Sequence, residues 1–194
     1  PNYKPRSEPA SGRAGGKVVK VDRVEFVDMP DPTQQVNALI AGEIDMIENV
    51  PHDLLPLLKA DKNLLTVNWN PLGQQFIIRF NHLTKPFDNP KIRQAALLAM
   101  RQEDYLKATV GEQQYYKVCT AAFPCGTPNG VEIGGDLLVK PNFEKAKALL
   151  KEAGYDGSPV VLMQSTTLPV LTNMAPVTKS LLEQAGFKVD MQSM

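Results

Sequence analysis

The C-terminal part of the chain places the tightest constraint on the fold, because it alternates strand, helix and strand patterns. Val160–Gln164 and Phe187–Met191 are short apolar runs that predict strands. Residues 171–185 lie between them and carry a helical pattern that stops at Gly186. This order predicts a βαβ unit with parallel strands and a right-handed crossover. We therefore expect a fold of the α/β class.

Helix-capping residues mark the other helices. Asp31 followed by Pro32 is typical of a helix N-terminus, and Gly42 is typical of its end. Asn142 and Gly154 bound the strongest helical pattern, in which the apolar side chains recur on one side. The helices expected before the βαβ unit lie at about 32–41, 51–60, 89–101, 103–110 and 142–154.

Four further segments predict strands from their β-branched and aromatic residues: 18–29, 44–47, 64–69 and 74–81. In residues 74–81, alternation places Gln75, Ile77, Arg79 and Asn81 on one face. Residues 1–17 are rich in proline and glycine and predict an arm or linker. Residues 112–140 predict a long loop.

Composition excludes some classes of function. The 194 residues hold 21 basic and 21 acidic side chains, so the net charge is zero, which disfavours binding to nucleic acid. No apolar run approaches the ~20 residues of a membrane span. The chain does not begin with Met and stops straight after an apparent strand, so we expect a piece of a longer protein.

Residues with possible catalytic or metal-binding roles do not form a convincing site. Residues 12–17 resemble a phosphate loop only faintly, and a linker is favoured because the glycine spacing is one short and Val18 replaces the required Ser or Thr. His52 and His82 lack partners at zinc-ligand spacing. Glu43, Asp45 and Glu48 favour a solvated edge over an acid–base pair. We therefore expect no catalytic residues, no metal and no cofactor.

Cys119 and Cys125 enclose five residues, a spacing that fits neither a redox pair nor a zinc site. If the protein is exported, a disulfide between them is favoured and would contribute ~2 kcal/mol. Otherwise both cysteines are reduced.

Arg79 is the most informative single residue, because it stands in an otherwise apolar strand pattern between Ile78 and Phe80. A buried arginine requires a protein carboxylate or an anionic ligand as its partner. An edge position with the guanidinium in water is the alternative.

Several ordered motifs resemble the peptide/nickel/opine type of extracellular solute-binding protein, family five, which serves ABC importers. They cover nearly the whole chain in sensible order. The matching segments are Val24–Val27, Asp31-Pro32, Ala38–Asp45, Val50-Pro51, Phe80-Asn81, Lys85–Asn89, Ile92–Ala95, Phe143–Gly154 and Leu182–Val189.

The resemblance implies a fragment of a two-lobed periplasmic-binding-protein (class II) fold with mixed sheets. Residues 1–80 would be the C-terminal part of the first lobe with an N-terminal arm, and residues 81–194 the first half of the second lobe. The family's ligand cleft adjoins the strand equivalent to 74–81, so Gln75, Ile77 and Arg79 become the candidate cleft face.

In function, the resemblance implies the solute-binding subunit of an ABC importer, and no enzyme. The solute would be peptide-like or anionic, and the protein partners would be permease subunits. The protein would be a monomer. It would lie in the periplasm or outside the cell, with any membrane anchor outside this chain. The alternatives are a ligand-presenting sensor or interaction module on the same fold and, less favoured, an α/β enzyme domain.

Overall fold

Two units make up the chain in the computed structural model, Pro1–Glu48 and Asn49–Met194. The structure describes residue 4, residues 6–11 and residues 14–194.

The first unit contains one helix, α1 (Pro32–Ala41), among its described residues. Asp31 caps this helix, since its carboxylate accepts a hydrogen bond from the backbone amide of Gln34 over 2.9 Å. Gly42 ends it with φ of 75°, a left-handed conformation that only glycine adopts freely. The predicted start and end of this helix are therefore confirmed.

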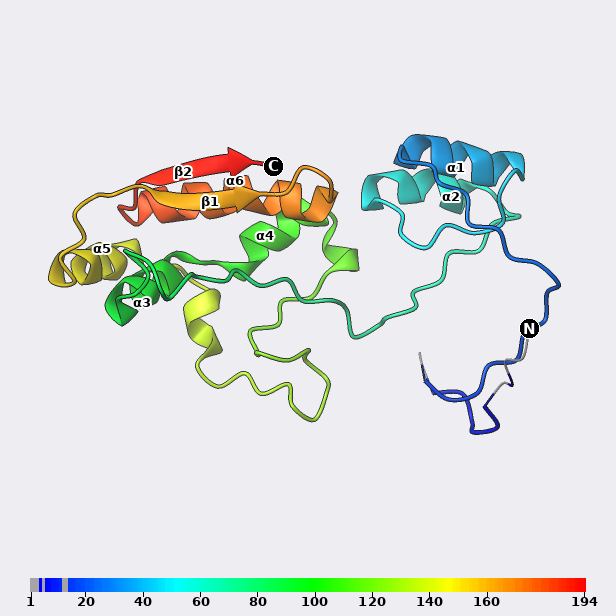
Figure 1. Ribbon diagram of the computed structural model, residues 1–194, viewed down its shortest axis with the longest axis horizontal. Helices are drawn as coiled ribbons and strands as arrows, with labels where there is room; N and C mark the ends of the chain where they lie inside the picture. Colours follow the sequence, from blue (N-terminus) through cyan, green and yellow to red (C-terminus); the bar gives the residue numbers. More distant parts are fainter. Residues whose placement is uncertain (1–3, 5, 12–13) are drawn as a thin grey trace. The chain divides into compact units, whose positions relative to one another are not determined.

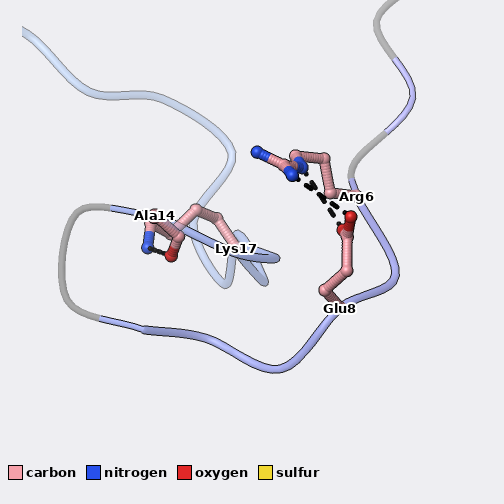
Figure 2. A network of polar contacts seen from close by, with 4 residues as sticks. All are labelled: Arg6, Glu8, Ala14 and Lys17. Atoms are coloured by element: carbon pink, nitrogen blue, oxygen red, sulfur yellow. Dashed lines mark hydrogen bonds and ion pairs between the residues drawn. The ribbon is translucent and has the colours of Figure 1, made fainter.

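The N-terminal arm is held by local polar contacts. Figure 2 shows the Arg6–Glu8 ion pair at 3.2 Å and the Lys17 ammonium, which donates to the Ala14 carbonyl oxygen over 2.8 Å. Gly12 and Arg13 of the segment that faintly resembles a phosphate loop lie outside the described residues.

The second unit contains five helices, three 3₁₀ turns and two strands. The 3₁₀ turns are His52–Leu54, Gln113–Tyr115 and Gly135–Leu138. The other elements are α2 (Leu55–Ala60), α3 (Pro90–Ala99), α4 (Gln102–Thr109), α5 (Phe143–Glu152), β1 (Val160–Gln164), α6 (Pro169–Gln184) and β2 (Val189–Ser193).

The predicted βαβ unit is present. β1 and β2 pair in parallel, with Val160 opposite Val189 and Gln164 opposite Ser193. Figure 1 shows α6 running along this strand pair, with α4 beside α6 and with α3 and α5 side by side. Residues of α3, α5, α6 and both strands, although far apart in the sequence, contribute to one buried core.

Small side chains allow the helices of this core to approach closely. Ala95 and Ala96 of α3, Ala146 of α5 and Ala185 after α6 are completely buried. Phe187 packs among them, with its ring centroid 5.4 Å from that of Tyr155 and 6.0 Å from that of Phe87. The core therefore lies between the helices and one face of the strand pair.

The four other predicted strands are wrong. Residues 18–29, 44–47, 64–69 and 74–81 have no regular structure, and Figure 1 draws them without arrows. A strand exists only where a second strand accepts its hydrogen bonds. No such partner occurs among the described ranges, and apolar side chains remain uncovered, with Phe26 98% and Trp69 82% exposed.

Candidate functional site

Residues 74–80 carry the predicted binding face. None of their backbone groups forms a hydrogen bond with the backbone of the described residues. Phe76 and Ile77 would lie on opposite faces of the predicted strand. Both side chains are exposed, by 44% and 68%, so neither face is buried against the protein. Because the segment is not a strand, its side chains are not held on two alternating faces as predicted.

The three predicted site residues lie in different surroundings. Gln75 donates from its side-chain amide to the Ala121 carbonyl oxygen over 3.1 Å. Ile77 lies in solvent. Arg79 is exposed and forms no ion pair or side-chain hydrogen bond within the part of the chain that the structure describes. The guanidinium of Arg79 is therefore exposed to water and has no carboxylate partner among the described residues.

The contacts of Gln75 lead to the long loop at 112–140, where Cys119 and Cys125 form a disulfide. The backbone amide of Cys125 also donates to the Cys119 sulfur over 3.0 Å. The loop that was expected to lack regular structure contains two short 3₁₀ turns, Gln113–Tyr115 and Gly135–Leu138. Its order comes from the disulfide, from side-chain contacts and from local backbone hydrogen bonds such as that from the Gly130 amide to the Thr127 carbonyl oxygen.

Two side chains that sequence reasoning did not single out hold this loop. The Gln102 side chain accepts from the backbone amide of Cys119 and donates to the Cys119 carbonyl oxygen, both over 2.6 Å. The Glu132 carboxylate accepts from the Thr120 hydroxyl over 2.8 Å and from the Thr120 amide, which lowers the pKa of Glu132. No local pattern announces these pairs, because their members are 17 and 12 residues apart.

The histidines and the acidic residues considered in the sequence analysis do not form a cluster among the described residues. The ring of His52 lies 5.3 Å from that of Tyr115, whereas His82 is an exposed loop residue. Glu43, Asp45 and Glu48 are all exposed. Within residues 4, 6–11 and 14–194, no group of three or more His, Cys, Asp and Glu is placed to hold a metal ion.

Two shallow surface depressions have linings that do not include the predicted binding face. Residues of α6 and β2 line one shallow depression, and residues around α1 line another in the first unit. Neither contains Gln75, Ile77 or Arg79. The helices of the described residues are also too short or too polar to cross a membrane.

Comparison with known proteins decides the family. The family model for the middle part of bacterial extracellular solute-binding proteins, family 5, matches residues 1–194. The chain belongs to this family. The resemblance stated from the sequence motifs is therefore confirmed.

Curated relatives of this family 5 chain are named as binding proteins. The chain is 40% identical to the "Probable peptide ABC transporter periplasmic-binding protein y4tO" of Sinorhizobium fredii, over 97% of this chain and 36% of that protein. It is 30% identical to the dipeptide-binding protein DppE of Bacillus subtilis, over 91% and 33% of the two chains. The chain therefore spans about a third of the length of these relatives.

Solved structures confirm the fold. The substrate-binding protein CtaP of Listeria monocytogenes matches with a TM-score of 0.65 and 22% identity, over 84% of this chain and 33% of that one. AgaA of A. tumefacien R10, solved with agropinic acid, matches with a TM-score of 0.62 and 22% identity, over 85% and 33%. The expected α/β fragment of a class II periplasmic-binding-protein fold is thus confirmed.

Proposed function

We propose that this family 5 chain belongs to the solute-binding subunit of an ABC importer, which captures a peptide or similar small solute between two lobes. The match of the family model over residues 1–194 carries this proposal. Relatives named for peptides and dipeptides support the ligand class. Binding needs no catalytic group, cofactor or metal, since enclosing the solute supplies the free energy that shifts the lobes towards closure.

The division into lobes falls near residue 80 in this proposal. The buried core cluster of the second unit begins at Ile92, and Phe80 and Phe87 pack against it from its edge. Residues 81–194 would form the first half of the second lobe, and residues 1–80 the last part of the first lobe with its arm. The segment 74–81 would then connect the lobes beside the cleft.

The chemistry of the exposed face favours a solute with both an apolar and an anionic part. Ile77 presents an uncovered aliphatic side chain. Arg79 presents a guanidinium that has no partner among the described residues, and this planar group binds carboxylates through two parallel hydrogen bonds. A peptide carboxylate, or another small organic anion, combines these properties.

The location and protein partners follow from the same proposal. The protein would act in the periplasm or outside the cell as a monomer that delivers its solute to permease subunits. The name of the y4tO relative supports the periplasmic location. The net charge of zero is consistent with a protein that does not bind nucleic acid.

Calorimetry on the intact protein tests the proposal, with glutathione and a panel of dipeptides as probes. We expect one-to-one binding of at least one probe, without chemical conversion of it. Arg79→Ala should weaken this binding by about ten-fold or more, because a hydrogen bond to a charged group contributes ~1.5–3 kcal/mol. Arg79→Lys should retain part of the affinity.

The matched control is Arg23→Ala, which removes an exposed arginine that pairs with Glu25 in the first unit. Its affinity should equal that of the wild type. Unchanged affinity in Arg79→Ala would remove Arg79 from the cleft. Turnover of a bound probe would contradict a pure binding function.

A further inference from the structure

The disulfide loop and the candidate binding face are connected by side-chain contacts that neither the family match nor the sequence motifs assign. We propose that the Cys119–Cys125 loop positions the binding face through Gln75, and that Gln102 is the positioning residue that fixes the loop to the helical core. This inference rests on the proposed function in one respect, the assignment of Ile77 and Arg79 to solute binding.

The first link is the contact between α4 and the loop. Gln102 is the first residue of α4, which packs against α6. Its side-chain amide meets both backbone groups of Cys119 at 2.6 Å, as a neighbouring strand would. A primary amide suits this arrangement, because its oxygen accepts while its NH₂ group donates. The loop is therefore anchored at one residue by a rigid helix end.

The second link is the closure of the loop itself. The disulfide and the Cys125 amide both return the chain to Cys119. The Thr127 hydroxyl donates to the Pro124 carbonyl oxygen over 2.7 Å and stabilises the turn that follows. Ala121 lies inside this closed loop and is buried. Its carbonyl group therefore lies two residues from the anchored Cys119, within the closed loop.

The third link is Gln75. Its side-chain nitrogen donates to the Ala121 carbonyl oxygen over 3.1 Å and lies 3.7 Å from the Cys119 sulfur. The loop also meets this segment at Leu72, because a Cβ on Gly126 would lie 3.6 Å from a Leu72 methyl group. The amide of Gln75 is therefore engaged within the protein, whereas Ile77 and Arg79 are not.

The chain of contacts separates the three predicted face residues into two roles. Gln75 holds the segment, and Ile77 and Arg79, two and four residues further on, are the groups left to contact a solute. Holding the backbone of an arginine in place before the solute arrives lowers the conformational entropy lost on binding and so raises the affinity. The loop would supply this order before the solute arrives.

A local structural test needs no solute. The probe is the δ-methyl resonance of Ile77 in the intact protein, with the methyl of buried Ile92 as a reporter of the folded core. Gln102→Ala, Gln75→Ala and the pair Cys119→Ser with Cys125→Ser should each shift or broaden the Ile77 signal and leave the Ile92 signal in place. Gln102→Glu, which keeps the acceptor but turns a carboxylate oxygen towards the Cys119 carbonyl oxygen, should also shift the Ile77 signal.

The matched control is Gln184→Ala, because among the described residues the Gln184 side chain bonds only to Ser180, one turn away on α6. It should leave the Ile77 signal unchanged. An Ile77 signal that is unaffected by Gln102→Ala and by the double serine variant, with Ile92 intact, would overturn the inference. If Gln102→Ala also disturbs the Ile92 signal, the Ile77 signals of Gln102→Glu and Gln75→Ala decide whether the inference holds.

A binding cycle tests the role in solute capture, with the dipeptide or glutathione probe that binds the wild type. Gln102→Ala should weaken binding several-fold in the wild-type background and have a smaller effect in the Arg79→Ala background, where only the contact of Ile77 with the solute remains to be positioned. A purely structural residue would reduce affinity equally in both. If no probe binds, or if Arg79→Ala binds normally, the proposed function or its face fails, while the Ile77 signal still decides whether the loop positions the segment.

Discussion

The side chain of Gln164 donates a hydrogen bond to the carbonyl oxygen of Thr172 over 2.9 Å. That carbonyl would normally accept from residue 176, but position 176 is a proline inside α6 and has no amide hydrogen. Gln164 is the last residue of β1, so the strand supplies the donor that the helix lacks. The same side chain accepts from the Ser193 hydroxyl of β2 over 2.8 Å. One buried glutamine thus joins all three elements of the βαβ unit.

Gln164→Leu should destabilise the protein by about 1–3 kcal/mol, because it leaves the Thr172 carbonyl without a donor. In a Pro176→Ala background the cost should be smaller, since residue 176 then donates to Thr172. Urea denaturation of the four proteins measures the coupling free energy. Ser193→Ala, measured alongside, reports the separate contribution of the second hydrogen bond. Equal costs of Gln164→Leu in both backgrounds would contradict this account.

Phe187→Ala should destabilise the protein by ~3–5 kcal/mol, because it opens a cavity in the core. Phe187 is only 4% exposed and contacts the aromatic rings of Phe87 and Tyr155. The control is Ile133→Ala, whose side chain is 92% exposed and which should change stability by no more than about 0.5 kcal/mol. Chemical denaturation gives both values, and similar values for the two variants would refute the assigned core.

Glu103 should make the stability of the protein depend on pH. Hydrogen bonds from Lys107 and Arg101 lower the pKa of Glu103 below its ordinary value of 4.5. The folded state therefore holds the ionised form more strongly than the unfolded state does. The resulting stabilisation is fully present above pH 4.5 and is lost as the pH falls through the lowered pKa.

Glu103→Gln should accordingly lower the melting temperature at pH 7 and have less effect at pH 3. The control is Glu144→Gln on α5, because that side chain is 87% exposed. Thermal unfolding followed by circular dichroism at both pH values provides the comparison. A Glu103→Gln effect that is as large at pH 3 as at pH 7 would exclude this electrostatic origin.

Helix positions were predictable because their signals are local. Asp31 and Asn142 each cap a helix through an amide three residues further along the chain, at 2.9 Å in both cases. The predicted and observed ends of a helix differ by a few residues where the backbone changes direction. The helix expected to reach about residue 101 ends at Ala99, because Met100 has an extended backbone with ψ of 144°.

The strands were predictable only where the chain contains both partners. Val160–Gln164 and the following strand pair with each other, although the second runs from Val189 to Ser193 and not from 187 to 191. The β-branched pattern at residues 64–69 is just as strong, but no described strand pairs with it. Pattern indicates which segments can form strands, whereas hydrogen-bond partners decide whether they do.

At the candidate site, too, the sequence indicated some features and the tertiary structure decided others. The sequence identified Arg79 as unusual and left open whether it is paired or in water, and the structure exposes it without a partner among the described residues. The cysteine spacing favoured a disulfide only conditionally, and the structure contains it. The contact of Gln75 with Ala121 had no sequence signal, because a glutamine amide can bind any backbone group that the fold brings near.

By itself, the sequence determined the family, the α/β class, the helix ends and the βαβ unit, because these depend on capping residues, periodicity and ordered motifs within short windows. Only the tertiary structure decided that Gln102 anchors the disulfide loop, that Gln75 binds this loop and that Gln164 completes α6. Each of these contacts joins residues from different elements. A side chain acquires such a role from the backbone groups that packing places around it, and no local pattern records them.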